Sequence, residues 1–145
     1  MTQPALPVAR VSVDSSLAHL DRPFDYQVPA ELDDSVVVGS RVRVRFSGRL
    51  VNGLVLDRVA ETDHAGKLTP VNRSVSAEPV LSAEVARLAR AVADRSAGTL
   101  ADVLRLAIPP RHARVEAKPS PDPVPAPPPP DPSGWAGYLA GPPLL

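Results

Sequence analysis

Four arginines near the middle of the chain have the spacing of a charged strand face. Arg41, Arg43 and Arg45 alternate with apolar residues, and Arg49 follows a Ser-Gly pair. Because successive side chains of a strand point to opposite faces, the apolar residues face a core and the cations face outward. A solvated strand surface is the simpler interpretation of this pattern. The functional alternative is a set of phosphate contacts formed by Arg41, Arg43, Arg45 and Arg49.

A carboxylate between two aromatic residues is the second feature that could bind a ligand. Phe24, Asp25 and Tyr26 follow one another, so both rings lie on one strand face and Asp25 lies on the other. Two aromatics on one face usually belong to a core. The alternative is that one ring stacks on a base while Asp25 accepts a hydrogen bond from a hydroxyl or amino group.

Signatures of catalysis and of metal binding are absent from the sequence. Gly66-Lys67 is not followed by Ser or Thr, so it is no phosphate loop. His19, His64 and His112 are far apart, and the adjacent carboxylates of Asp33-Asp34 diverge. The chain has no cysteine, which excludes thiol chemistry and Cys-ligated zinc. We therefore expect no catalytic residue, no metal site and no cofactor in this chain.

Charge and hydropathy narrow the class of protein further. The 16 basic and 16 acidic residues balance, which excludes a strongly basic nucleic-acid coat protein. No run of about 18 apolar residues and no signal-peptide pattern occurs, so we expect no membrane association and a cytoplasmic protein.

The elements that must position these residues are strands first and helices second. Alternating apolar residues predict strands over residues 8–13, 23–28, 41–46, 49–59 and 69–75. Ser47-Gly48 predicts a turn, and Gly53 indicates a mid-strand bulge or a close backbone approach.

Capping residues and helical spacing predict two helices after residue 78. Ser82 and Thr99 are the expected N-caps, Gly98 is the expected end of the first helix, and Pro109-Pro110 ends the second. The fold class is α+β: a small, mainly antiparallel, barrel-like sheet followed by two helices and then a proline-rich linker.

The distribution of proline separates a folded region from a proline-rich C-terminal region. Residues 119–145 hold 11 of the 19 prolines, so most of this region can form neither helix nor central strand. We predict an N-terminal tail over 1–7, a folded domain over 8–115, a Pro-rich linker over 116–133, and the truncated start of a following domain over 134–145.

Taken in order, several motifs resemble the N-terminal 3′ DNA-binding domain of the PriA family of replication-restart helicases. The motifs are Leu20-Asp21-Arg22-Pro23-Phe24-Asp25-Tyr26 with Val28-Pro29, residues 39–46 with Gly53, Ser76-Ala77-Glu78-Pro79-Val80-Leu81, and Leu100-Ala101-Asp102-Val103-Leu104. The resemblance covers roughly residues 8–115.

The resemblance implies a module that holds the 3′ end of the nascent leading strand at stalled replication forks, for replication restart and primosome assembly. The implied pocket contains Phe24, Asp25 and Tyr26, the turn at Ser47 and Gly48, and Lys67. The family usually has Pro-Phe-Gly where this chain has Arg45-Phe46-Ser47, and often a basic residue where Thr69 stands.

The resemblance also implies properties of longer relatives. A winged-helix-like domain would begin at residues 134–145, followed by an ATP-dependent 3′–5′ DNA helicase that uses magnesium and zinc. The implied partners are fork DNA with a 3′-hydroxyl end and, through the parent chain, primosome proteins and single-strand-binding protein near the nucleoid.

Two other functions fit the residues themselves. One is a protein-interaction β-barrel whose Pro-rich tail docks a partner. The other is a general single-strand-binding or RNA-binding barrel, which would bind internal segments as well as ends.

Overall fold

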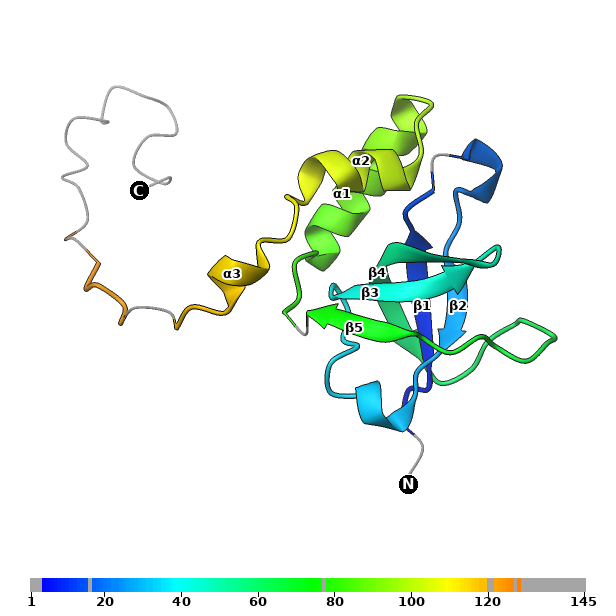
Figure 1. Cartoon of the computed structure of the whole chain (residues 1–145). Coiled ribbons are helices and arrows are strands. Elements are labelled where there is room, and N and C mark those ends of the chain that lie inside the picture. The colour runs from blue at the N-terminus through cyan, green and yellow to red at the C-terminus, as the bar shows by residue number, and fades with distance from the viewer. Residues whose placement is uncertain (1–3, 16, 77, 120–121, 127, 129–145) are drawn as a thin grey trace. The chain divides into compact units, whose positions relative to one another are not determined.

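The computed structural model describes residues 4–15, 17–76, 78–119, 122–126 and 128. The chain divides into two compact units, residues 1–110 and 111–145. The first unit holds one sheet and two helices (Figure 1). Its strands are β1 (Val8–Val13), β2 (Phe24–Gln27), β3 (Arg41–Phe46), β4 (Arg49–Val59) and β5 (Arg73–Ser76). Two short 3₁₀ turns, Ala18–Leu20 and Ala30–Leu32, lie in the connections.

The sheet is antiparallel, with strand order β2-β1-β4-β3-β5. β3 and β4 form a hairpin in which Phe46 pairs with Arg49. Both residues of its turn have positive φ, 47° at Ser47 and 78° at Gly48, as a type I′ turn requires. The predicted turn is therefore confirmed, and its twist matches that of the two strands.

The prediction of a strand over residues 69–75 is wrong at its start. β5 covers Arg73–Ser76 and pairs with β3, whereas the preceding residues bond to β2 at the other edge of the sheet. The Gln27 N–H donates to the Thr69 carbonyl (3.0 Å), and the Val71 N–H donates to the Gln27 carbonyl (2.8 Å). Residues 69–71 thus cross from one sheet edge to the other before β5 begins.

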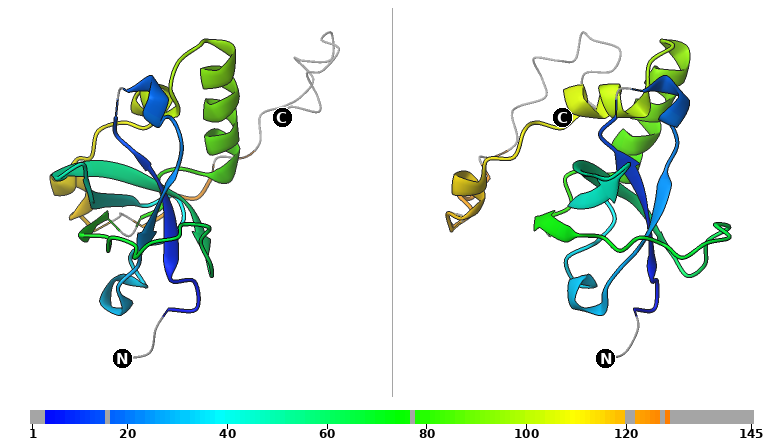
Figure 2. Two further views of the ribbon diagram at one scale, coloured as in Figure 1. Left: turned by 90° about the vertical axis from the view of Figure 1, so that its right-hand side faces the viewer. Right: turned by 45° about the vertical axis from the view of Figure 1, so that its right-hand side comes forward.

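Because residues 69–71 cross between the two edges, the sheet resembles a barrel that is only partly closed. Among the described residues, a single parallel bridge between Gln27 and Pro70 joins the two edges, and no continuous ladder closes the sheet. The strongly curled sheet is visible from the side in Figure 2.

The inner face of the curled sheet forms the first core. It consists largely of valines: Val11, Val13, Val28, Val36, Val42, Val44, Val55 and Val71. Gly53 lies against β1, where an added Cβ would stand 2.5 Å from Val11 Cγ1 and 3.1 Å from the Ser12 carbonyl oxygen. The predicted close backbone approach is confirmed, because no side chain fits at Gly53.

A second core lies between the outer face of β4 and two helices, α1 (Ala83–Arg95) and α2 (Leu100–Ala107). Leu54 and Leu56 of β4 pack there against the buried residues Leu81, Ala89, Leu100 and Leu104. β4 therefore buries both its faces, which explains why its sequence is apolar at consecutive positions rather than at alternate ones.

Both predicted N-caps are confirmed. The Ser82 hydroxyl accepts from the Val85 N–H at 3.3 Å, and the Thr99 hydroxyl accepts from the Asp102 N–H at 3.2 Å. Gly98 was expected to end the first helix, but α1 already ends at Arg95, and Gly98 is not the residue with the left-handed conformation. Ala97 takes the left-handed conformation (φ 52°), and the Gly98 N–H donates to the Ala93 carbonyl at 3.1 Å, in the manner of a Schellman cap.

The helix count also differs from the prediction. A third short helix, α3 (Ala113–Glu116), lies in the second unit, where Arg111 pairs with Glu116 at 2.6 Å. The four residues of α3 form a single turn after the N-cap His112, and one turn is too short for a periodic apolar pattern. Residues 122–126 and 128 have no regular secondary structure, and the segment 134–145 lies outside the described residues.

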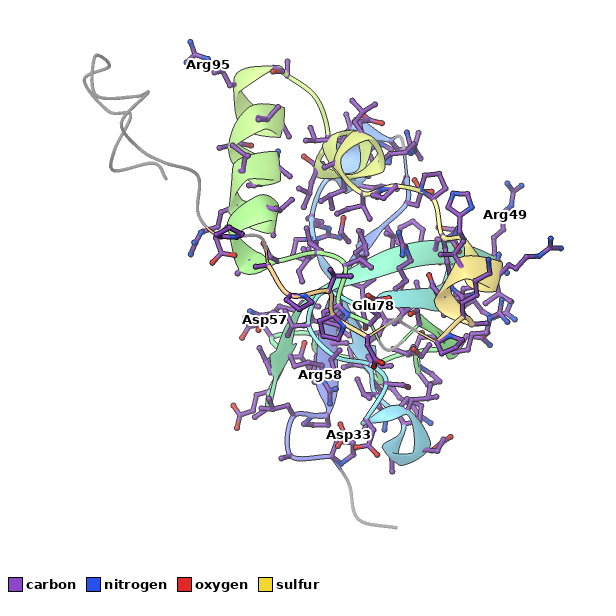
Figure 3. The ribbon with its side chains drawn as sticks, turned by 90° about the vertical axis from the view of Figure 1, so that its left-hand side faces the viewer. Asp33, Arg49, Asp57, Arg58, Glu78 and Arg95 are labelled. Atoms are coloured by element: carbon purple, nitrogen blue, oxygen red, sulfur yellow. The ribbon has the colours of Figure 1, made fainter. Side chains whose placement is uncertain are left out.

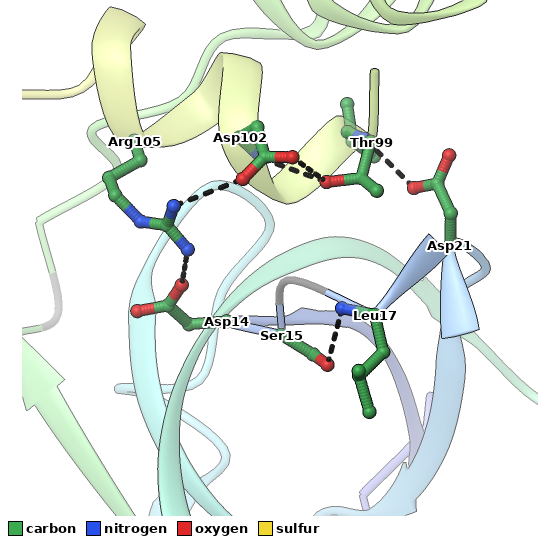
Figure 4. A network of polar contacts seen from close by, with 8 residues as sticks. Asp14, Ser15, Leu17, Asp21, Thr99, Asp102 and Arg105 are labelled. Carbon is green, nitrogen blue, oxygen red and sulfur yellow. Dashed lines mark hydrogen bonds and ion pairs between the residues drawn. The ribbon is translucent and has the colours of Figure 1, made fainter. Parts of the chain in front are cut away.

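Asp21, in the loop between β1 and β2, bonds to both α1 and α2. One carboxylate oxygen accepts from the Leu100 N–H at 2.8 Å, at the N-terminus of α2, and the other accepts from Arg90 of α1 at 2.8 Å. The Asp21 side chain is only 18% exposed. Nearby, Arg105 joins Asp102 to Asp14 of the same connection (Figure 4). These contacts fix the connection that leads into β2.

Replacement of Asp21 by alanine should lower the free energy of unfolding by about 2 kcal/mol, because the N-terminus of α2 loses an acceptor and Arg90 loses a partly buried partner. Urea unfolding of both proteins measures this. Asp94→Ala is the matched control, since Asp94 pairs with the same Arg90 but is 66% exposed. It should change the stability by less than about 0.5 kcal/mol. Equal losses in the two variants would contradict the role given to Asp21.

Candidate nucleic-acid interface

Asp25 lies on the outer face of β2, opposite to the core. The register places it beside Arg10 of β1, which in turn stands beside Asp57 of β4. Arg10 Nε lies 3.7 Å from Asp25 Oδ1, and Arg10 Nη1 lies 4.0 Å from Asp57 Oδ2. Thr62, from the loop between β4 and β5, donates its hydroxyl hydrogen to Asp25 Oδ2 at 2.5 Å.

The two carboxylate oxygens of Asp25 are therefore in different situations. Oδ2 is held by Thr62, whereas no described residue donates a hydrogen bond to Oδ1. The Asp25 side chain is 20% exposed, so Oδ1 can accept a hydrogen bond from a ligand while Thr62 fixes the orientation of the group. Arg10 offsets part of the negative charge but stands beyond hydrogen-bond distance.

The two aromatic neighbours of Asp25 point to the inner face and differ in exposure. Tyr26 is 4% exposed, and its hydroxyl donates to the Arg45 carbonyl oxygen at 3.3 Å. Phe24 is half-buried and meets Phe46 edge-to-face, with ring centroids 4.7 Å apart. The guanidinium of Arg22 lies 5.1 Å from the Phe24 ring centroid. Tyr26 thus joins β2 to β3, and of the two rings only Phe24 has surface for a ligand.

The other residues of the predicted pocket lie on two connections. Ser47 and Gly48 are exposed in the β3–β4 turn, next to Phe46 and so at the Phe24 end of β2. The Gly48 carbonyl accepts from Arg45 Nη1 at 3.2 Å. Lys67 is exposed on the β4–β5 loop that projects from the sheet (Figure 2). In this loop it is Thr62, rather than Lys67, that contacts Asp25.

The four predicted arginines have different positions and hydrogen-bond partners in the structure. Arg41 Nη2 donates to the Pro109 carbonyl at 2.5 Å, so it secures the chain after α2. Arg43 is half-buried and Arg45 is exposed, both on the outer face of β3. Arg49 stands opposite Phe46 in the hairpin, so it lies on the opposite face from Arg43 and Arg45, and it is exposed (Figure 3). The predicted alternation of β3 is therefore confirmed, with Val42 and Val44 buried and the arginines at the alternate positions, of which Arg41 is bonded to the Pro109 carbonyl.

Sequence reasoning missed three residues of this region. Arg10 and Arg73 stand directly opposite Asp25 and Arg43 in the register, so a correct strand pairing would have found them. Thr62 had no such signal, because a loop residue carries no periodic pattern that places it. Outside this region, Asp33 pairs with Arg58 at 2.7 Å (Figure 3). The largely buried Arg58 side chain also donates to the Val36 carbonyl.

Comparison with known proteins identifies the family. Residues 10–109 match the model of the 3′ DNA-binding domain (3′BD) of PriA. The chain belongs to this family of 3′ DNA-binding domains. It is also 57% identical, over 131 residues, to the probable replication restart protein PriA of Mycobacterium tuberculosis, and 56% identical, over 134 residues, to that of Mycobacterium leprae. The replication restart protein PriA of Bacillus subtilis is 32% identical over 102 residues.

These relatives are much longer than this chain. The matched region is 90% of this chain but only 20% of the M. tuberculosis protein, and 70% of this chain but 13% of the B. subtilis protein. The family resemblance recognised in the ordered motifs between Leu20 and Leu104 is thereby confirmed. In the described part of the chain, no helix is long and apolar enough to cross a membrane, and no group of three or more acidic or histidine side chains is arranged to hold a metal ion.

The buried phenol of Tyr26 should make stability sensitive to alkaline pH. Burial raises the pKa of Tyr26 from 10.0 to about 12. The unfolded chain therefore loses this proton first, and the stability present below pH 10 falls as the pH rises to about 12. In Tyr26→Phe this loss should be smaller, although the variant should be about 1 kcal/mol less stable near neutral pH, where the hydrogen bond to Arg45 is missing.

Urea unfolding of both proteins, below pH 10 and near pH 12, measures the difference. Parallel pH dependences in the two proteins would show that Tyr26 does not stay protonated in the folded state.

Proposed function

We propose that this chain binds the free 3′ end of a DNA strand and that Asp25 accepts a hydrogen bond from the terminal 3′-hydroxyl. The observation that carries the proposal is the state of the Asp25 carboxylate: Thr62 orients one oxygen, and the other has no donor among the described residues. Membership of the 3′ DNA-binding domain family supports the nature of the ligand.

The chemistry of a 3′ terminus suits such a carboxylate. A terminal nucleotide offers a hydroxyl donor that internal nucleotides lack, because their 3′ oxygen is esterified. A 3′-phosphate would bring negative charge to Asp25 and remove the donor, which should cost about 2 kcal/mol or more. Phe24 is half-buried and contacts Phe46, the residue before the turn at Ser47 and Gly48, and its accessible part offers an apolar surface for the terminal sugar or base. Lys67 on the adjoining loop is a candidate phosphate contact.

In the cell this module would act in replication restart. The names of the relatives support a role in replication restart. At stalled forks the module would hold the 3′ end of the nascent leading strand without catalysis of its own. Unwinding by an ATP-dependent helicase with magnesium and zinc would belong to regions of a parent protein outside these residues. Primosome proteins and single-strand-binding protein would be partners of that parent protein, in the cytoplasm near the nucleoid.

The test compares two ends of the same DNA. The full chain is titrated with a labelled partial duplex that ends in a 3′-hydroxyl or in a 3′-phosphate, and binding is followed by fluorescence anisotropy. The hydroxyl end should bind roughly 30-fold more tightly, which corresponds to about 2 kcal/mol. Asp25→Ala should remove the preference.

Asp57→Ala is the matched control. It removes a second carboxylate beside Arg10, but Asp57 is 54% exposed and lies on β4, on the other side of Arg10 from Asp25, so the preference should remain. Equal affinity of the wild-type chain for both ends would refute recognition of the terminus. Binding that needs residues 119–145 and a protein partner instead of DNA would favour the protein-interaction function.

A further inference from the structure

Three arginines form an outward-facing cluster on β3 and β5, which we call the arginine face: Arg43, Arg45 and Arg73. Arg43 and Arg73 stand directly opposite each other in the antiparallel pair. Like charges in this position destabilise a sheet, because the side chains are held close together. A fold that keeps such a pair needs a source of negative charge to offset it.

The chain does not supply that charge. Six arginines of the described residues have a carboxylate within 4.0 Å: Arg10, Arg58, Arg87, Arg90, Arg105 and Arg111. The arginine face has none among the same residues, although acidic residues are as numerous as basic ones in the whole chain. Nine acidic residues of the described chain pair with these six arginines, and none of them pairs with the arginine face, which therefore carries an uncompensated positive charge.

Arg43 is held in place without an ion pair. Its side chain is half-buried, and its Nε is buried and has no hydrogen-bond acceptor within the described part of the chain. Packing against the sheet, rather than a partner carboxylate, therefore restrains the guanidinium. Arg45 and Arg73 are exposed on either side of it. A half-buried cation flanked by two exposed ones is suited to a polyanion such as a phosphate backbone.

The backbone connects the arginine face to the Asp25 region. Residues 69–71 bond to Gln27, two positions after Asp25, and the Asn72 N–H donates to the Arg43 carbonyl at 3.0 Å. The segment from Thr69 to Arg73 therefore reaches β2 at one end and Arg43 at the other. A DNA strand that follows this segment away from Asp25 meets Arg73 and Arg43 in turn.

From these observations we propose that the arginine face binds the phosphate backbone of the DNA strand upstream of its 3′ terminus. Arg41 and Arg49 are not part of this site. Arg41 donates a hydrogen bond to the Pro109 carbonyl, and Arg49 lies on the opposite face of the sheet. The proposal rests on the proposed function for the identity of the strand. It adds a second contact region, which should contribute affinity and salt dependence but no preference for one terminus over the other.

The test uses the double variant Arg43→Gln with Arg73→Gln in the full chain. With a labelled single strand longer than the site, the slope of log K against log salt concentration should become shallower by about 1.4, from the loss of two phosphate contacts. Affinity at low salt should fall at least about fivefold, by the same amount for 3′-hydroxyl and 3′-phosphate ends. A dinucleotide with a free 3′-hydroxyl has a single internucleotide phosphate and no backbone further upstream, so it should bind both proteins equally.

The control variant loses the same charge elsewhere. Arg87→Gln with Arg95→Gln changes two exposed arginines of α1 and should leave the salt slope unaltered. Thermal unfolding checks the fold of the test variant, which should be no less stable than the wild type because two opposed cations are removed. If the double variant does not fold, the single Arg73→Gln, on an exposed edge-strand residue, should lower the slope by about 0.7.

The outcomes separate this inference from the proposed function. An unchanged slope in the arginine variant, or an equal change in the α1 control, overturns the arginine face as a phosphate site. A wild-type chain that binds both ends equally refutes terminus recognition, while a reduced slope in the arginine variant would still support phosphate contacts at this face.

Discussion

The curl of the sheet, held where its two edges meet at Gln27, is the constraint on which the rest of the structure depends. The backbone bonds of Gln27 to Thr69 and Val71 bring the strand of Asp25 next to the segment that leads into β5. The same curl brings Phe24 against Phe46 and the Tyr26 hydroxyl to the Arg45 carbonyl across the interior. A flat sheet of the same strand order would place β2 and β5 at opposite edges, far from each other.

The tight curvature of the sheet requires small residues and a central strand that is buried on both faces. Gly53 lets β1 and β4 approach at a point where any Cβ would overlap Val11. β4 then carries valine toward the inner core and leucine toward α1 and α2, so one strand supports both cores. Because Asp21 ties both helices to the connection that leads into β2, the helical layer also fixes where β2 begins, and with it Asp25.

Periodicity and turn chemistry predicted most of the elements. The alternation in residues 41–46 and the Ser47-Gly48 pair predicted the β3–β4 hairpin, and Ser82 and Thr99 marked both helix starts. The start of β5 was missed because residues 69–71 are extended like a strand but bond to the opposite edge, a long-range fact that no local pattern contains. Ala97 was missed because a non-glycine residue at a left-handed position contradicts the usual preference, which pointed to Gly98.

In the candidate site, too, local sequence patterns predicted some features, while others depend on long-range contacts. That Asp25 faces outward while Phe24 and Tyr26 face inward follows from alternation alone. Thr62 reaches Asp25 only through the fold of a long loop, and Arg73 faces Arg43 only through the pairing of β5. The net charge could not reveal the arginine face either. The total is balanced, but most carboxylates form ion pairs with arginines outside this face.

The most direct test of the account is a backbone amide NMR titration of the full chain with a dinucleotide that carries a free 3′-hydroxyl. The account predicts that shifts concentrate at Phe24, Asp25 and Thr62 and are weak when the dinucleotide ends in a 3′-phosphate. Shifts confined to α1 and α2, or the same shifts with both dinucleotides, would contradict the claim that Asp25 recognises the end of the strand.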